Sequence, residues 1–291
     1  MPTARLLPPL LLAALAAAAV AAPPQPSQSL DQVTVEAHRQ ALEQRVTEFV
    51  QKLAHVDRDE SLKRWNQPVC PLVAGLAQAQ GEFMLARISD VARRAAVPLA
   101  DEHCRPNFYI VATADPEQLL KAWKQRDRNL YGGAMPGQIR RFLDHDRPVR
   151  IWYNASLAAA GGGPIQPQAA DAGVDFVPTN RRAKASRLQF NDIMVFGSVI
   201  VVINLQRVQG LHYGQLTDYV ALLGLAQLDA DADLGSAPSI LQLFSAHPPQ
   251  PLPEGLSDWD LQFLQALYAT EQTSFTQRNQ IIQMMMRGLP P

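Results

Sequence analysis

The sequence predicts an α+β domain with a single mixed β-sheet packed against helices, plus an N-terminal amphipathic helix. Two observations lead to this fold class. Short β-forming runs, the strongest at 199–203, alternate with segments whose apolar residues recur every three or four positions. The 291 residues, 47% of them hydrophobic, also suffice to bury one sizeable core.

Composition limits the classes of function. The formal net charge is -1, and charged residues make up 18% of the chain. This balance fits neither a strongly basic nucleic-acid-binding protein nor a chain that is disordered throughout. We therefore expect no nucleic-acid partner, and any charged partner must meet a local patch.

Residues 1–21 have the features of a secretory signal peptide. Arg5 precedes an apolar run at 6–20, and small residues in the A-x-A pattern end at Ala21. Cleavage is expected after Ala21, because a cut one residue later would leave a proline first in the product. The alternative is a membrane anchor, but two prolines at 8–9 interrupt a segment already short for a span. We expect an exported protein, periplasmic or extracellular, without stable membrane insertion.

Cys70 and Cys104 are the only cysteines in the chain. Oxidising surroundings outside the cytoplasm favour a disulfide between them. Closing a loop of this length stabilises the fold by about 3 to 4 kcal/mol on the chain-entropy estimate. The alternative is a nucleophilic cysteine beside His103, which would require a thiol kept free in that compartment. We predict the bonded pair.

Composition also divides the chain along its length. Pro, Gln and Ser dominate 23–29, and globular composition begins at Trp65. The expected parts are a signal peptide (1–21), a linker with the N-terminal helix (22–64), the α+β domain (65–270) with a long loop or insertion at 158–184, and a C-terminal helical tail (271–291).

Apolar residues at helical spacing predict the helices. The first covers 42–53 and the second 84–95. A third begins at Pro116, because Asp115 supplies an N-cap and Gln118 its reciprocal capping partner. Later helices are expected from Tyr213 to Leu228 and at the methionine-rich end of the chain, where an apolar face should dock on the core.

Three runs predict strands of one sheet. Phe108–Ala112 has the composition of a buried strand, Val149–Tyr153 alternates like a half-exposed strand, and Val199–Ile203 is the most strongly β-forming run. The segment 158–184 has Gly, Pro and Ala without a sustained period, which predicts a loop. The basic cluster at 181–184 is expected to be solvated.

The segment from Val199 to Tyr268 carries a resemblance to a known family. It contains a strand, a short turn, a helix ending in Gly224-Leu225, then "PSILQLF" and "LSDWDLQFLQALY". This order resembles the catalytic half of zincin-type metallopeptidases, in which an H-E-x-x-H-x-x-G-L helix precedes a small "SI" turn and a packing helix. The blocks "RWNQPVCP", "CRPN", "DYVAL" and "LYAT" also resemble secreted bacterial proteins, and that likeness implies no activity.

The motif positions lack the groups that hold zinc. With Gly224-Leu225 as the anchor, Thr217 and Ala221 stand where the two histidines belong. Asp218 stands where the glutamate base belongs, and Gln227 where a third ligand belongs. Zinc needs at least three nitrogen, sulfur or carboxylate donors in a fixed geometry. The resemblance therefore implies a zincin-like scaffold whose metal site is degenerate, and we expect no metal and no cofactor.

The first functional hypothesis is a non-catalytic secreted protein that binds a peptide or an envelope protein. In the resembling family, an extended peptide pairs with the edge strand that precedes the active-site helix. Here that strand would be 199–204, so the groove would include Val199, Val201 and Ile203, with 158–184 as a lid. The alternative is that the protein's own chain covers this edge.

The second hypothesis is a metal-independent or unrecognised hydrolase that uses His212, Asp218 and His247. Both histidines stand in loop-like contexts and are expected to be exposed. Converging titratable side chains in one pocket would support the enzyme. An apolar or shallow groove at Thr217, Asp218 and Ala221 would support the binding protein.

Overall fold

The computed structural model describes residues 30–54, 61–126, 130–132, 134–159, 167–168, 177–178, 192–272 and 276–290. The chain divides into two units, residues 1–37 and residues 38–291, and apart from the start of the first helix the second contains every feature discussed below. The expected signal peptide and the basic cluster at 181–184 lie outside the described residues. Among the helices of the described ranges, none is long and apolar enough to cross a membrane.

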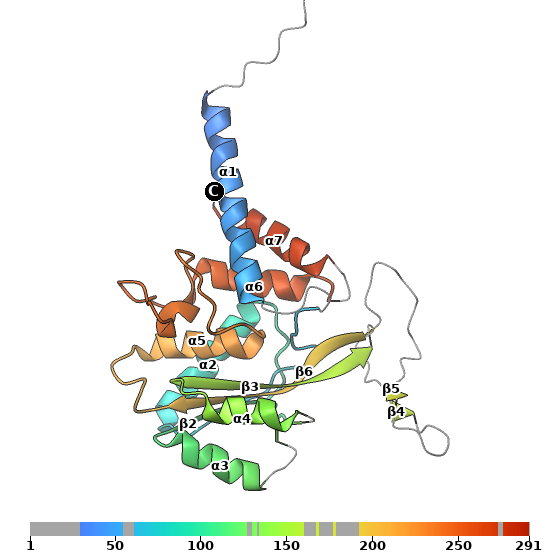
Figure 1. Cartoon of the computed structure of the whole chain (residues 1–291), viewed down its shortest axis with the longest axis vertical. Helices are drawn as coiled ribbons and strands as arrows, with labels where there is room; N and C mark the ends of the chain where they lie inside the picture. The colour runs from blue at the N-terminus through green and yellow to red at the C-terminus, as the bar shows by residue number, and fades with distance from the viewer. Residues whose placement is uncertain are drawn as a thin grey trace, which may run out of the picture. The chain divides into compact units, whose positions relative to one another are not determined.

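A four-stranded mixed sheet lies at the centre of this unit (Figure 1). Its strands follow the spatial order β1 (Pro71–Ala74), β2 (Phe108–Thr113), β6 (Asp192–Asn204) and β3 (Val149–Ala159). The first three run parallel, and β3 runs antiparallel to β6. The three predicted strands therefore belong to one sheet, as expected, although β3 and β6 are much longer than predicted.

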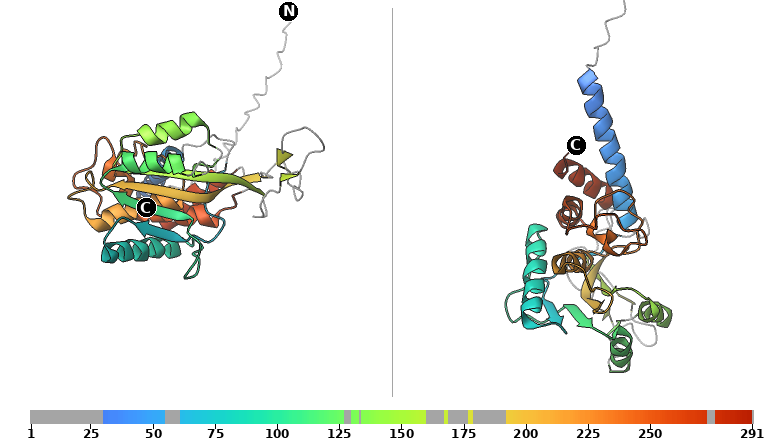
Figure 2. Two further views of the ribbon diagram at one scale, coloured as in Figure 1. Left: turned by 90° about the horizontal axis from the view of Figure 1, so that it is seen from below. Right: turned by 90° about the vertical axis from the view of Figure 1, so that its left-hand side faces the viewer.

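Helices cover both faces of the sheet (Figure 2). One face packs against α2 (Gln78–Arg94) and α5 (Tyr213–Leu225), and the other against α3 (Pro116–Arg126) and α4 (Pro136–Asp144). Side chains of β6 alternate between the two cores, as the pleat of a strand requires. Odd-numbered residues at 199–203 join the larger core, and even-numbered ones join the smaller.

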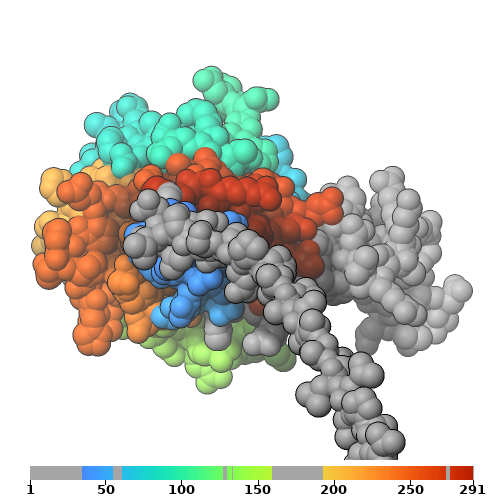
Figure 3. All heavy atoms as spheres, turned by 90° about the horizontal axis from the view of Figure 1, so that it is seen from above, coloured from blue at the N-terminus to red at the C-terminus, as the bar shows by residue number. Residues whose placement is uncertain are grey.

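The larger core extends outward through the C-terminal helices α6 (Asp258–Ala269) and α7 (Gln277–Gly288). Figure 3 shows these helices, in red, beside α2, in cyan. The first helix, α1 (Leu30–Leu53), contributes Phe49, whose ring lies 5.3 Å from that of Trp259 on α6. A separate two-stranded ladder joins β4 (Pro167–Gln168) to β5 (Val177–Pro178).

Local chemistry explains where α3 begins. The amide of Gln118 donates to Oδ1 of Asp115 at 2.9 Å, so the predicted N-cap is present and the helix starts at Pro116. Gln118 was predicted to supply the reciprocal acceptor for the amide of Asp115. In the structure this amide donates to Oγ1 of Thr113 at 3.2 Å. The predicted helix from Tyr213 ends at Leu225 and not at 228, since the next residue is extended.

A disulfide joins Cys70 and Cys104, as predicted. It ties the residue before β1 to the loop that leads into β2. Both sulfur atoms are bonded, so the alternative of a nucleophilic thiol beside His103 does not apply to this structure.

The expectation that residues 199–204 form an exposed edge strand is wrong. This part of β6 pairs with β2 on one side and with β3 on the other. The amide of Val199 donates to the carbonyl of Asn107 at 2.9 Å, so by alternation the amide of Val201 also faces β2. Val199, Val201 and Ile203 are buried. The alternative holds: the protein's own chain covers this strand.

A buried carboxylate connects the 3₁₀ turn η1 (Ile240–Phe244) to α6. Asp260 accepts hydrogen bonds from the hydroxyl of Ser239 at 2.6 Å and from the amides of Ile240 at 2.8 Å and Ser257 at 3.0 Å. Burial raises the pKa of Asp260 to about 6, although these hydrogen bonds act in the opposite direction.

We compare the unfolding free energy of the parent with that of an Asp260→Asn variant. The difference should decrease in the parent's disfavour as pH rises from about 4 to about 6. The folded carboxyl with a pKa of about 6 keeps a proton that the unfolded one, near 3.9, releases. The contribution is complete below pH 4 and is lost as pH rises through 6, a change of about 3 kcal/mol. Urea unfolding at pH 4, 5, 6 and 7 measures it, and a difference that stays constant with pH would contradict the assignment.

Candidate functional site

Helix α5 carries the positions that resemble a metallopeptidase motif, and all its residues from Gln215 to Leu225 are buried. The hydroxyl of Thr217 donates to the carbonyl of Tyr213 at 2.8 Å, one turn earlier in the helix. Ala221 is fully buried and offers no ligand atom. At these two positions the side chains serve the helix and the core.

Asp218 is 1% exposed, and its carboxylate accepts three hydrogen bonds. Arg87 of α2 donates from Nε to Oδ1 at 2.5 Å and from Nη2 to Oδ2 at 2.7 Å. The amide of Leu256 donates to Oδ2 at 2.7 Å. The hydrogen bond to Asp218 is the main cause that raises the pKa of Arg87. Asp218 thus holds α2 and the segment before α6 against α5.

The histidines of the hydrolase hypothesis are exposed, as expected. His212 precedes α5, where its amide donates to Oε1 of Gln215 at 3.0 Å, and His247 follows η1. Within the described ranges, neither histidine is a hydrogen-bond partner of Asp218. No three His, Cys, Asp or Glu side chains of these ranges are grouped as metal ligands would be.

Gly224, the anchor of the resemblance, lies where α5 comes closest to the sheet. A Cβ atom at this position would overlap the ring of Phe108, which is fully buried on β2. The indole nitrogen of Trp65 donates to the carbonyl of Gly224 at 2.8 Å. Close packing between helix and strand therefore explains the glycine without any reference to metal chemistry.

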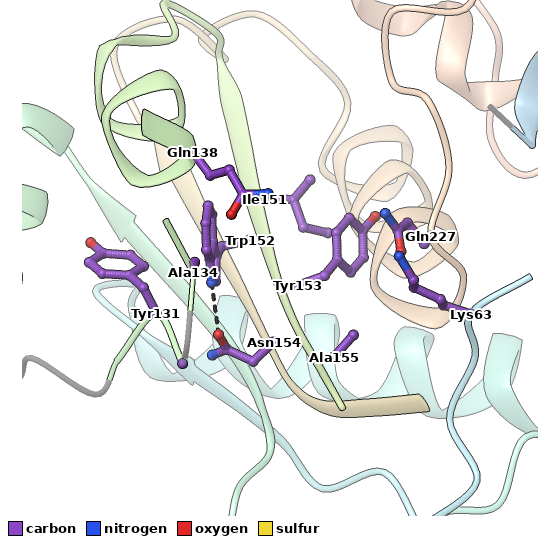
Figure 4. A pocket seen from close by; sticks show the side chains of 11 residues that line it. Lys63, Tyr131, Ala134, Gln138, Ile151, Trp152, Tyr153, Asn154, Ala155 and Gln227 are labelled. Carbon is purple, nitrogen blue, oxygen red and sulfur yellow. Dashed lines mark hydrogen bonds between the residues drawn. The ribbon is translucent and has the colours of Figure 1, made fainter. Parts of the chain in front are cut away.

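Gln227 lies beyond the end of α5 and lines a pocket of about 480 Å³ at the outer edge of β3. Figure 4 shows Tyr131 and Trp152 on one side of β3, with Tyr153 and Gln227 on the other. The pocket thus spans the strand edge and meets both faces of the sheet. Its lining comprises Lys63, Tyr131, Gly132, Ala134, Gln138, Ile151, Trp152, Tyr153, Asn154, Ala155 and Gln227.

Among the described residues, the backbone of β3 presents to this pocket hydrogen-bonding groups that pair with no neighbouring strand. The amide of Asn204 donates to the carbonyl of Pro148 at 2.8 Å, and bonded and non-bonded pairs alternate along an antiparallel ladder. Ile151 and Tyr153 therefore occupy non-bonded positions, and their N–H and C=O groups point away from β6. In the described part of the chain, β3 is the last strand on that side of the sheet.

Hydrogen bonds fix the side chains that surround this edge. The hydroxyl of Tyr153 donates to the carbonyl of Leu223 at 2.8 Å, and burial strongly raises the pKa of Tyr153. The indole of Trp152 donates to Oδ1 of Asn154 at 2.8 Å, and Nδ2 of Asn154 donates to the carbonyl of Leu130, also at 2.8 Å. The pocket walls are therefore already ordered without a ligand.

Two buried polar atoms of the pocket lack a protein partner. The hydroxyl of Tyr131 and Oε1 of Gln227 are buried and make no hydrogen bond within the described residues. Buried polar atoms are normally satisfied by protein groups, water or a ligand. The hydroxyl of Tyr131 can donate and accept, whereas Oε1 of Gln227 can only accept. The two groups lie on opposite faces of β3.

This pocket was not predicted from the sequence. A signal was present, since "PVRIWYNA" alternates like a half-exposed strand and begins with a proline, which is typical of edge strands. Of the predicted site residues, only Gln227 lies in the pocket, whereas Thr217, Asp218 and Ala221 are packed inside the protein.

Comparison of the chain with models of known families, with curated proteins and with solved structures gave no match. The resemblance to zincin-type metallopeptidases therefore stays a prediction.

Replacing Arg87 should destabilise the fold more than replacing Asp218. Arg87→Met leaves a buried carboxylate without its cation, which typically costs about 3 to 5 kcal/mol. Asp218→Asn leaves a guanidinium that is 41% exposed and can be hydrated, so we expect about 1 to 2 kcal/mol. Urea unfolding measures both. The opposite order would show that the pair does not hold α2 in this way.

Gly224→Ala should destabilise the protein by about 2 to 3 kcal/mol, because the added methyl group has no space beside Phe108. Gly137→Ala is the matched control, since α4 leaves a Cβ there without any neighbour within 4 Å. The control should unfold at or slightly above the urea midpoint of the parent. Equal midpoints for all three proteins would contradict the close approach of α5 to β2.

Proposed function

We propose that this protein is a non-catalytic, exported peptide-binding protein that adds an extended segment of an envelope protein to the outer edge of β3. The observation that carries the proposal is the free backbone edge at Ile151 and Tyr153 inside a preformed pocket. Strand addition gives affinity through main-chain hydrogen bonds and specificity through side-chain pockets on the two faces.

The edge can supply four ladder hydrogen bonds, because Ile151 and Tyr153 each offer one donor and one acceptor. At about 1 kcal/mol net for each bond, the ladder contributes about 4 kcal/mol. Micromolar affinity corresponds to about 8 kcal/mol. The side-chain contacts of the pocket must therefore supply a similar share.

Successive side chains of a bound peptide would point to opposite faces of the extended sheet. On the face of α4 they would meet Tyr131, Trp152 and Gln138, which are aromatic and polar. On the face of α5 they would meet Tyr153 and Gln227. The amide side chains of Gln138 and Gln227 in the lining would meet polar peptide side chains. We therefore expect peptides that alternate apolar or aromatic residues with hydrogen-bonding ones.

The degenerate zincin-like scaffold is part of this proposal. In the resembling family a peptide pairs with the edge strand next to the active-site helix, and here that role falls to β3, not to residues 199–204. The engagement of Asp218 by Arg87 and the lack of donor atoms at Ala221 support a non-catalytic role. The disulfide is consistent with an exported protein.

A screen of synthetic hexapeptides with free carboxyl ends tests the function. Fluorescence polarisation should find binders in the micromolar range, and N-methylation at every second residue of a binder should weaken it at least tenfold. Ile151→Pro removes an outward donor and should also weaken binding at least tenfold.

Ile151→Val is the matched control, because it keeps the amide and nearly all of the side chain. It should bind within about threefold of the parent, and near-ultraviolet circular dichroism should show both variants folded. The proposal is wrong if a folded Ile151→Pro variant binds the selected peptides as well as the parent, or if the screen finds no binder.

A further inference from the structure

A second pocket, of about 270 Å³, continues the first along the edge of β3. The two pockets share Ile151 and Trp152. The end of α4 lines the second pocket on one side, and the segment after α5, at 228–231, lines it on the other. A peptide paired with Ile151 and Tyr153 would therefore reach it at the amino-terminal end of β3.

The second pocket is positively charged. Its ionisable lining consists of Arg141, His145, Arg147 and Arg150 against one acid, Asp231. Arg147 is bound to Asp231 and donates to the carbonyl of Ala230 at 3.1 Å. Asp231 pairs with Arg147 and Glu117 pairs with Arg150, so the three arginines leave one net positive charge, that of Arg141, beside the peptide path.

Of these arginines, Arg141 remains available to an anion. Arg150 is 4% exposed, is bound to Glu117 and donates to the carbonyl of Leu143 at 3.0 Å, so it is engaged within the protein. Arg141 is exposed on α4 and makes no ion pair with any other described residue. Arginine binds carboxylates with paired, charge-assisted hydrogen bonds.

The outward-facing backbone groups of β3 that a peptide could reach also end beside the second pocket. The amide of Arg147 donates to the carbonyl of His145 at 3.1 Å, so it is not available to a peptide. Val149 is 3% exposed, which leaves Ile151 as the first accessible outward residue of β3. A bound peptide would therefore leave the ladder next to the basic pocket.

We infer that the β3 edge takes the carboxyl-terminal segment of a polypeptide, antiparallel to β3, with its α-carboxylate in the basic pocket beside Arg141. Antiparallel pairing, the commoner and slightly more stable arrangement, brings the carboxyl end of a peptide to the amino-terminal end of β3. The charge of the second pocket and the end of the ladder agree with this direction. The inference rests on the proposed function, because it requires strand addition at β3.

The test compares three forms of each hexapeptide that binds: the free acid, the C-terminal amide, and an amide whose last residue is glutamate. The free acid should bind at least about tenfold more tightly than the amide. Arg141→Ala should remove most of this difference, because it weakens binding of the free acid more than binding of the amide. Arg140→Ala is the matched control, since this neighbouring arginine is also exposed but does not line the pocket, and it should keep the difference.

Each result separates this inference from the function on which it rests. Equal binding of acid and amide, with both still sensitive to Ile151→Pro, would overturn the inference and leave strand addition intact. Binding of the glutamate-ended amide as tightly as the free acid would assign the pocket to a side-chain carboxylate and overturn recognition of a chain end. A difference that persists in Arg141→Ala would overturn the role of Arg141.

Discussion

The burial of α5 is the constraint on which the rest of the structure depends. The helix packs against the sheet, α2 and η1, and close approach to β2 permits no side chain at Gly224. A helix in this position cannot leave polar groups unpaired. Asp218 is therefore satisfied by Arg87 from α2 and by the amide of Leu256, two segments that the carboxylate also positions.

The site on β3 follows from the same arrangement. Because β6 lies inside the sheet, β3 becomes its outer strand, and the helices on both faces supply the walls of the pockets. Tyr153 links the two regions, since its hydroxyl bonds to the last turn of α5 while its backbone faces the free edge. The core that fixes α5 thus also fixes the geometry of the edge.

Local patterns predicted the local structure well. The strand segments, the start at Pro116 and the disulfide could be read from periodicity, capping chemistry and the presence of a single cysteine pair. The neighbours of β6 could not, because strand order depends on contacts between distant segments and leaves no local signature. The same holds for Arg87 and Asp218, which are 131 residues apart in the chain. The pocket residues Tyr131 and Gln227 are likewise brought together only by the folded sheet, so the sequence alone suggested a site around α5.

The place of β6 in the sheet also determines when the sheet can form. β2 lacks a neighbour on one side and β3 lacks any partner in this sheet until β6 is present, and β6 ends at Asn204. The parallel pairing of β2 with β6 closes a loop of about 90 residues, a slow, non-local step. During synthesis, the first two thirds of the chain therefore emerge before the sheet can close. A nascent chain that ends before β6 therefore contains β1, β2 and β3 but lacks the strand that joins β2 to β3.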